Sequence, residues 1–204
     1  MTGAQFFNVG VGTAVNLQDI KPTGDDTSDN VIIQTLDAYG HGVATYNWID
    51  YAGDNGDEAA WVDDNYEIVT DVTFEPGQGL WVDGSSAEQG FQSSGKVGTV
   101  DVDVSLQAGS TAVVNPFPVG VNLQDILPLG DDTSDNVIIQ TLDAYGHGVA
   151  TYNWIDYAGD NGDECAWVDD NYEIVTDVTF APGKGLWVDG SSDSQSLRFP
   201  APEL

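Results

Sequence analysis

Residues 31–49 read VIIQTLDAYGHGVATYNWI, and residues 137–155 repeat them without a change. The first six residues are mostly β-branched and apolar, as in a largely buried strand. A Gly-His-Gly turn follows, and its glycines can adopt the positive φ that a tight hairpin requires. Residues 43–49 are again β-branched and aromatic. The stretch therefore predicts a β-hairpin that occurs twice in the chain.

The hairpin lies within a longer duplication. Residues 15–86 recur as residues 121–192 with a constant offset of 106, and 67 of the 72 aligned positions are identical. The five differences are Lys21/Leu127, Thr23/Leu129, Ala59/Cys165, Glu75/Ala181 and Gln78/Lys184. The third difference leaves a single thiol, which excludes an intramolecular disulfide, and we expect Cys165 to be a small buried residue.

The pattern between the turns predicts an all-β protein. Short apolar runs alternate with turn signals, 24 Gly and 8 Pro are present, and a helical period of 3.6 residues is absent. A chain of 204 residues has room for two domains of about 100 residues each. We predict two tandem, near-identical, jelly-roll-like β-sandwich domains at residues 1–98 and 121–204, joined by connecting strands at 99–120 that are shared or exchanged.

Charge is the strongest signal in the composition. The chain carries 34 Asp and Glu against four Lys and Arg, a formal net charge of −30. Nucleic acid is excluded as a partner, because phosphate binding needs clustered cations. No apolar run reaches about 18 residues, so no membrane insertion is predicted. The first residues lack the features of a signal peptide, which fits either a cytosolic protein or a mature chain whose leader was replaced by Met1. Of these two, we predict an extracellular or cell-surface location.

The acids are mostly Asp, which favours turns and is also a common calcium ligand. Two acidic loops recur in each copy, without the spacing of an EF-hand. The candidate ligands are Asp25, Asp26, Asp29, Asp54, Asp57, Glu58, Asp131, Asp132, Asp135, Asp160, Asp163 and Glu164. We predict calcium as a stabilising cofactor and no organic cofactor. The alternative is that these acids form turns and solvate the surface.

The connecting segment contains a strand that occurs once. Val100, Val102, Val104 and Leu106 alternate with polar residues and so share one face. A counterpart for the first copy would precede residue 1, and after the second copy Leu204 corresponds only to Gly98. If each copy needs this strand, one copy has an open sheet edge. Alternatively it is an ordinary interdomain strand, replaced in the other copy by residues 5–9 or 196–199.

An open edge invites a strand from another chain. A tandem chain that offers one edge and one strand can associate head to tail, which gives filaments unless the contacts close into a ring. We therefore predict a structural protomer of an extracellular fibre, tube or surface layer, whose partner is another copy of itself. The predicted assembly residues are Val100, Val102, Val104, Leu106, Phe6 and Phe7.

Four short runs carry a family resemblance: VSLQAG at 104–109, NPFP at 115–118, VNLQDI at 121–126 and GKGLWV at 183–188. Together they resemble repetitive, β-rich modules of secreted bacterial surface proteins, which largely lack an assigned activity. The first copy matches at 15–20 and 77–82 but departs at 8–11, where the Pro and Phe are absent. The resemblance implies an exported structural or adhesive role and no catalytic residues.

Catalytic motifs are absent from the sequence. His41 and His147 each lie in a Gly-His-Gly turn, without the Cys and His cluster of a zinc site. No Gly-x-Ser-x-Gly run marks a nucleophile. With carboxylates throughout the chain, no particular acid–base pair can be identified. We predict that the protein is not an enzyme.

Aromatic residues near the loops support an alternative function, a bivalent carbohydrate-binding or adhesive surface protein with a polysaccharide as partner. Exposed rings stack on sugars, and two identical sites raise avidity. The candidates are Tyr39, Tyr51, Trp61, Tyr145, Tyr157 and Trp167. The competing interpretation is that aromatic rings form the core, since they dominate the packing of small β domains.

Overall fold

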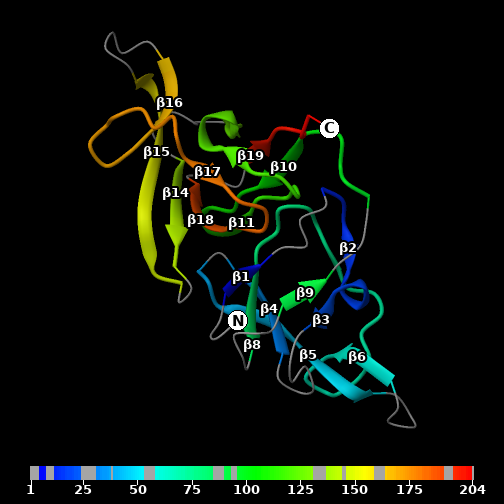
Figure 1. Cartoon of the computed structure of the whole chain (residues 1–204). Coiled ribbons are helices and arrows are strands. Elements are labelled where there is room, and N and C mark those ends of the chain that lie inside the picture. The colour runs from blue at the N-terminus through cyan, green and yellow to red at the C-terminus, as the bar shows by residue number, and fades with distance from the viewer. Residues whose placement is uncertain are drawn as a thin grey trace.

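The structure is a computed structural model of the 204-residue chain. It describes residues 5–7, 12–23, 31–37, 39–52, 58–84, 90–92, 96–130, 137–143, 146–158, 164–190 and 195–203. These residues form an all-β fold with several sheets and two single-turn 3-10 helices, η1 (Leu17–Asp19) and η2 (Leu123–Asp125) (Figure 1). Among them, no helix has the length and apolar character that crossing a membrane would require.

Two five-stranded antiparallel sheets have the same strand order. The first comprises β1 (Gln5–Phe7), β8 (Leu80–Gly84), β4 (Val31–Leu36), β5 (Gly42–Ala52) and β6 (Glu58–Val62). The second comprises β11 (Gly109–Val114), β18 (Gly185–Gly190), β14 (Ile138–Leu142), β15 (Gly148–Ala158) and β16 (Glu164–Val168). The predicted hairpin is confirmed in both, because β4 pairs with β5 and β14 pairs with β15. We call β1–β9 the first half and β10–β19 the second half.

Smaller sheets accompany each large sheet. In the first half, β2 (Val15–Asn16) pairs with β7 (Thr73–Phe74), and β3 (Lys21–Thr23) pairs with β9 (Gly90–Gln92). In the second half, β12 (Val121–Asn122) pairs with β17 (Thr179–Phe180), and a three-stranded sheet contains β10 (Val102–Ser105), β19 (Ser196–Phe199) and β13 (Leu127–Leu129). This difference in strand number separates two otherwise matching halves.

Each half buries a tryptophan at the centre of its core. Trp61 and Trp167 are fully buried, and their indole N–H groups donate to the carbonyl oxygens of Ile20 and Ile126 at 2.8 and 2.7 Å. Each ring meets a second tryptophan edge to face, with centroids 5.4 Å apart. Burial of an aromatic ring is therefore combined with a satisfied N–H, as a buried indole requires.

A glutamine from each 3-10 helix binds the backbone of the large-sheet strand that contains the buried tryptophan. In the first half, the Gln18 side chain donates to the carbonyl oxygens of Trp61 and Val69 at 2.9 and 2.6 Å and accepts from the Trp61 N–H at 3.2 Å. In the second half, Gln124 makes the same three bonds. The run VNLQDI thus places one polar side chain against backbone groups of a buried strand, as the repeated sequence requires.

Cys165 is exposed on β16, so the expectation of a buried residue was wrong. The next residue, Ala166, is buried in a small cluster with Ile155 and Val168. Since neighbouring side chains in a strand point to opposite faces, Cys165 points away from that cluster.

The two halves are joined by backbone hydrogen bonds at β11. The Gly79 N–H donates to the Ala112 carbonyl at 3.0 Å, and the Val114 N–H donates to the Gly77 carbonyl at 2.9 Å. A turn of the first half therefore extends the large sheet of the second half along the edge of β11 that faces away from β18. Figure 1 shows β11 and β1 near this junction.

Candidate assembly interface

The candidate site consists of two sheet edges, one in each half. With the offset of 106, β9 corresponds to the first three residues of β19, and β3 corresponds to β13. In the second half, β19 lies between β13 and β10. In the first half, β9 pairs with β3 alone among the described residues. One half therefore contains a third strand where the other half has an edge.

Strand β10 closes the core of the second half. Val102, Val104 and Leu106 are buried, and the polar residues between them are exposed, which confirms the predicted alternation. These three side chains belong to the same core cluster as Leu197 and Phe199 of β19. Val100 does not follow the prediction: it is 69% exposed, because the strand begins only at Val102.

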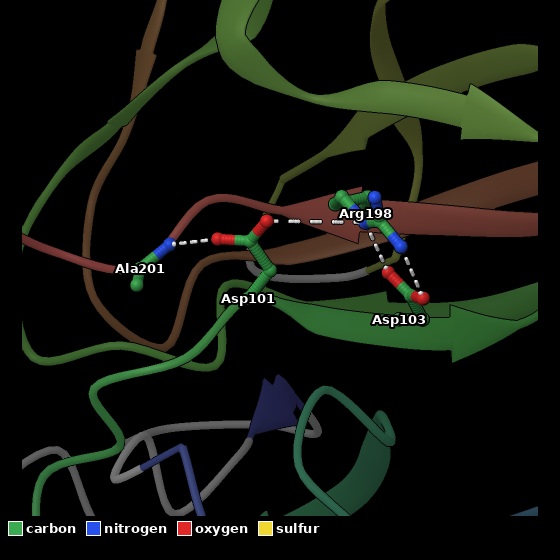
Figure 2. A network of polar contacts seen from close by, with 4 residues as sticks. All are labelled: Asp101, Asp103, Arg198 and Ala201. Carbon is green, nitrogen blue, oxygen red and sulfur yellow. Dashed lines mark hydrogen bonds and ion pairs between the residues drawn. The ribbon is translucent and has the colours of Figure 1, made fainter.

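A charged clamp holds β10 against β19. Arg198 donates from Nε to Asp103 Oδ1 at 2.7 Å and from a terminal nitrogen to Oδ2 at 2.8 Å (Figure 2). Asp101 accepts from the Ala201 N–H at 2.9 Å and lies 4.0 Å from Arg198 Nε. Bidentate pairing of this kind fixes both position and direction. In the first half, Gln92 stands at the position of Arg198.

The hydrogen bonds from Arg198 hold the pKa of Asp103 below its ordinary value. A lowered pKa in the folded state means that the pair stabilises the fold at pH values above the pKa of the unfolded side chain. The contribution is lost as the pH falls through the lower, folded pKa. The clamp is therefore intact at neutral pH.

The pairing pattern shows which backbone groups of β10 face its outer edge, the edge away from β19. The Leu106 N–H donates to the Gln195 carbonyl at 2.9 Å. Backbone groups in an antiparallel strand alternate in direction, so those of Val104 also face β19, whereas those of Asp103 and Ser105 face outward. This edge borders a hollow of about 600 Å³ that Glu75 of the first half also lines.

Burial differs between the two corresponding strands. Leu197 of β19 is fully buried under β10, whereas Phe91, at the same position of β9, is half-buried. The Phe91 ring stacks on Trp61, with centroids 6.3 Å apart and an interplanar angle of 20°. The first half thus has an aromatic side chain where the second half has a leucine covered by another strand.

The predicted calcium ligands lie almost entirely outside the described residues. These are Asp25, Asp26, Asp29, Asp54, Asp57, Asp131, Asp132, Asp135, Asp160 and Asp163. Glu58 and Glu164 begin β6 and β16, and the description does not extend to their side chains. In the part of the chain that is described, no group of three His, Cys, Asp or Glu could hold a metal ion. Calcium binding stays a prediction.

The predicted sugar-stacking residues divide into three groups. Tyr39 is 77% exposed beside His41, with ring centroids 6.1 Å apart. Trp61 and Trp167 are fully buried, so their assignment as stacking surfaces was wrong, because the core encloses both rings. The remaining three, Tyr51, Tyr145 and Tyr157, have side chains outside the description.

The other predicted residues belong to strand ends and turns. Phe6 and Phe7 lie in β1, which pairs with β8 and not with β9, and their side chains are outside the description. His41 and His147 are exposed, with Nδ1 3.3 and 3.1 Å from the carboxylates of Asp37 and Asp143. Hydrogen bonds within this turn, chiefly from the His41 backbone N–H, lower the pKa of Asp37. The contacts are those of a turn that is stabilised by its own aspartate.

The chain matches no protein-family model, no curated protein and no solved structure. The resemblance to bacterial surface modules therefore stays a prediction. A functional proposal for this chain therefore rests on the geometry of the β9 and β10 edges.

Proposed function

We propose that the protein is a non-catalytic structural protomer that assembles head to tail by strand addition into an extracellular fibre, tube or surface layer. Strand β9 of one copy pairs with the outer edge of β10 of the next copy. We also infer that each half is a jelly-roll-like sandwich domain. One observation carries the proposal: β19 has β10 as a neighbour, whereas the corresponding β9 has no such neighbour among the described residues.

The proposed contact makes β10 the central strand between two corresponding strands, β19 of its own chain and β9 of the neighbour. It closes two edges at once, and exposed edges are a liability that proteins normally cover. The two edges belong to different halves, so the contact is heterologous. A linear assembly keeps one free β9 edge at one end and one free β10 edge at the other, so addition continues until the assembly closes into a ring or stops.

Net charge opposes this assembly. Each copy carries −30, so the approach of two copies requires screening or bound cations. Screening by salt acts over about 8 Å at physiological ionic strength. The predicted calcium sites in the acidic loops would lower the same repulsion, and calcium is part of the proposal for this reason.

Replacing Ser105 with Pro tests the proposed edge. Proline removes a backbone N–H, and at this position the lost N–H faces the outer edge, so the hydrogen bonds between β10 and β19 remain. We expect the wild-type chain to form linear oligomers whose mass grows with concentration in light scattering and negative-stain microscopy. Ser105→Pro should stay monomeric, and the matched control Ser105→Ala should assemble like the wild type.

The same samples are compared in sodium chloride, magnesium chloride and calcium chloride at equal ionic strength, with a reductant present to keep Cys165 as a thiol. Longer oligomers in calcium alone would support calcium binding. Equal lengths in all three salts would show that the salts act only by screening the negative charge. A wild-type chain that stays monomeric in every salt, or a Ser105→Pro variant that assembles normally, would contradict the proposal.

A further inference from the structure

A partly open cavity of about 260 Å³ lies where the two halves meet. Its walls contain residues of the first half together with their own counterparts in the second half. Three such pairs are Gln34 and Gln140, Gly40 and Gly146, and Trp81 and Trp187. We propose that this cavity binds one neutral polyhydroxylated ligand, of the class of a single sugar ring, in each chain.

The halves meet reciprocally around this cavity. A Cβ atom added to Gly40 would lie 3.0 Å from the end of the Trp187 ring, and one added to Gly146 would lie 3.0 Å from the same atom of Trp81. Each hairpin turn thus rests on the indole of the other half. The duplicated sequence therefore contributes corresponding residues from both halves to a single site.

Glycine is required at both turn positions for two reasons. Gly40 has φ +77° and Gly146 has φ +81°, values that other residues rarely adopt. A Cβ there would also press on the indole of the opposite half, which would have to move by a few tenths of an ångström. Both features let the turn of each half approach the indole of the other half beside the cavity.

The chemistry of the walls suits an uncharged ligand with hydroxyl groups. Among the described residues, none that lines the cavity is charged, although the chain carries −30. Indole faces pack against the C–H groups of a sugar ring, and glutamine amides can both donate to and accept from hydroxyl groups. Gln34 Nε2 lies 3.2 Å from Thr45 Oγ1, a contact that orients this amide.

The size of the cavity limits the ligand. Ligand pockets usually measure about 300–1,000 Å³ and lie at domain interfaces, lined by apolar groups with a few polar ones. A volume of about 260 Å³ lies just below that range and favours one ring over an oligosaccharide. The site uses neither β9 nor β10, so its test is independent of the assembly proposal.

The test uses glucose, galactose and mannose as neutral probes, with glucuronate as the charged comparison. The probes are titrated into the ¹⁵N-labelled full chain while the indole N–H signals of the six tryptophans are recorded. We expect at least one neutral probe to saturate at one molecule per chain, and to shift the signals of Trp81 and Trp187. The signals of the core residues Trp61 and Trp167 should stay in place.

The double variant Gln34→Leu with Gln140→Leu removes the hydroxyl partners, and we expect affinity to fall at least about tenfold. Gln107→Leu, an exposed position outside the cavity, is the matched control and should bind like the wild type. If the double variant loses its fold by circular dichroism, each single variant is used. No saturation by any neutral probe, stronger binding of glucuronate, or unchanged binding by the variants that fold would overturn the proposal.

Discussion

Replacing Val104 with Asp is expected to lower the free energy of unfolding by about 3 kcal/mol or more. Val104 is buried on the inner face of β10, in the core cluster of the second half. Its side chain also lies close to Gly77 of the first half. A carboxylate at this position has no described cation to pair with, because Arg198 is bound to Asp103 on the opposite, exposed face. Urea denaturation followed by tryptophan fluorescence measures the change.

Ser105→Asp is the matched control, because it adds the same charge to the same strand on its exposed face. We expect this variant to differ from the wild type by about 0.5 kcal/mol or less. Equal losses in the two variants would contradict the assignment of β10 to the core. Hydrogen exchange in Val104→Asp should increase in β19 while the strands β4 and β5 of the first half keep their protection.

Replacing Trp61 or Trp167 with Ala is expected to cost about 3–5 kcal/mol in each case. Both rings are fully buried, and their indole N–H groups donate to the corresponding carbonyls of Ile20 and Ile126 at 2.8 and 2.7 Å. The Phe variants keep most of the ring but leave one buried carbonyl without its donor, and a smaller loss of about 1–3 kcal/mol is expected. Urea midpoints and slopes of the four variants provide the comparison.

These two positions also separate a core role from a sugar-binding role. Tyr39→Ala is the matched control, since Tyr39 is an exposed aromatic side chain in the first half. We expect this variant to change the stability by no more than about 0.5 kcal/mol. Losses below about 1 kcal/mol in the tryptophan variants would contradict their burial and restore them as candidate stacking surfaces.

Local patterns in the sequence predicted the parts of the fold that depend on near neighbours. The hairpin of β4 and β5 follows from a β-branched run, a glycine turn and a second β-branched run within residues 31–49. The alternation of Val102, Val104 and Leu106 predicted β10 and its buried face. The run at 15–20 alternates apolar and polar residues, and in the structure it forms β2 followed by η1.

Contacts between distant residues could not be predicted in the same way. Asp103 and Arg198 are 95 positions apart, and no local pattern aligns them. The sequence therefore predicted that β10 is a strand, but it could not show that this strand pairs with β19 of the second half. Arg198 is the only arginine of the chain. A single arginine among many acids was a usable sign that it forms an ion pair with one of them.

The candidate sites show the same limit. Trp61 lies between two loops in the sequence, which suggested exposure, but the Ile20 carbonyl 41 positions away receives its N–H inside the core. The cavity between the halves depends on how two identical hairpins meet, and this information is absent from either copy taken alone. The duplication itself was the usable signal, because near-identical repeats in one chain can present the same residues to each other.

The most direct test of the account compares amide hydrogen exchange in β9 and β19 at low and high protein concentration. In the dilute chain, β19 should exchange slowly between its two neighbours, and β9 should exchange at least about tenfold faster as an edge strand. In the assembled protein, β9 should become protected to a similar degree, and Ser105→Pro should keep β9 fast at every concentration. Protection of β9 that equals that of β19 in the dilute chain, or fast exchange of β9 in the assembled protein, would contradict the proposed pairing of β9 with β10.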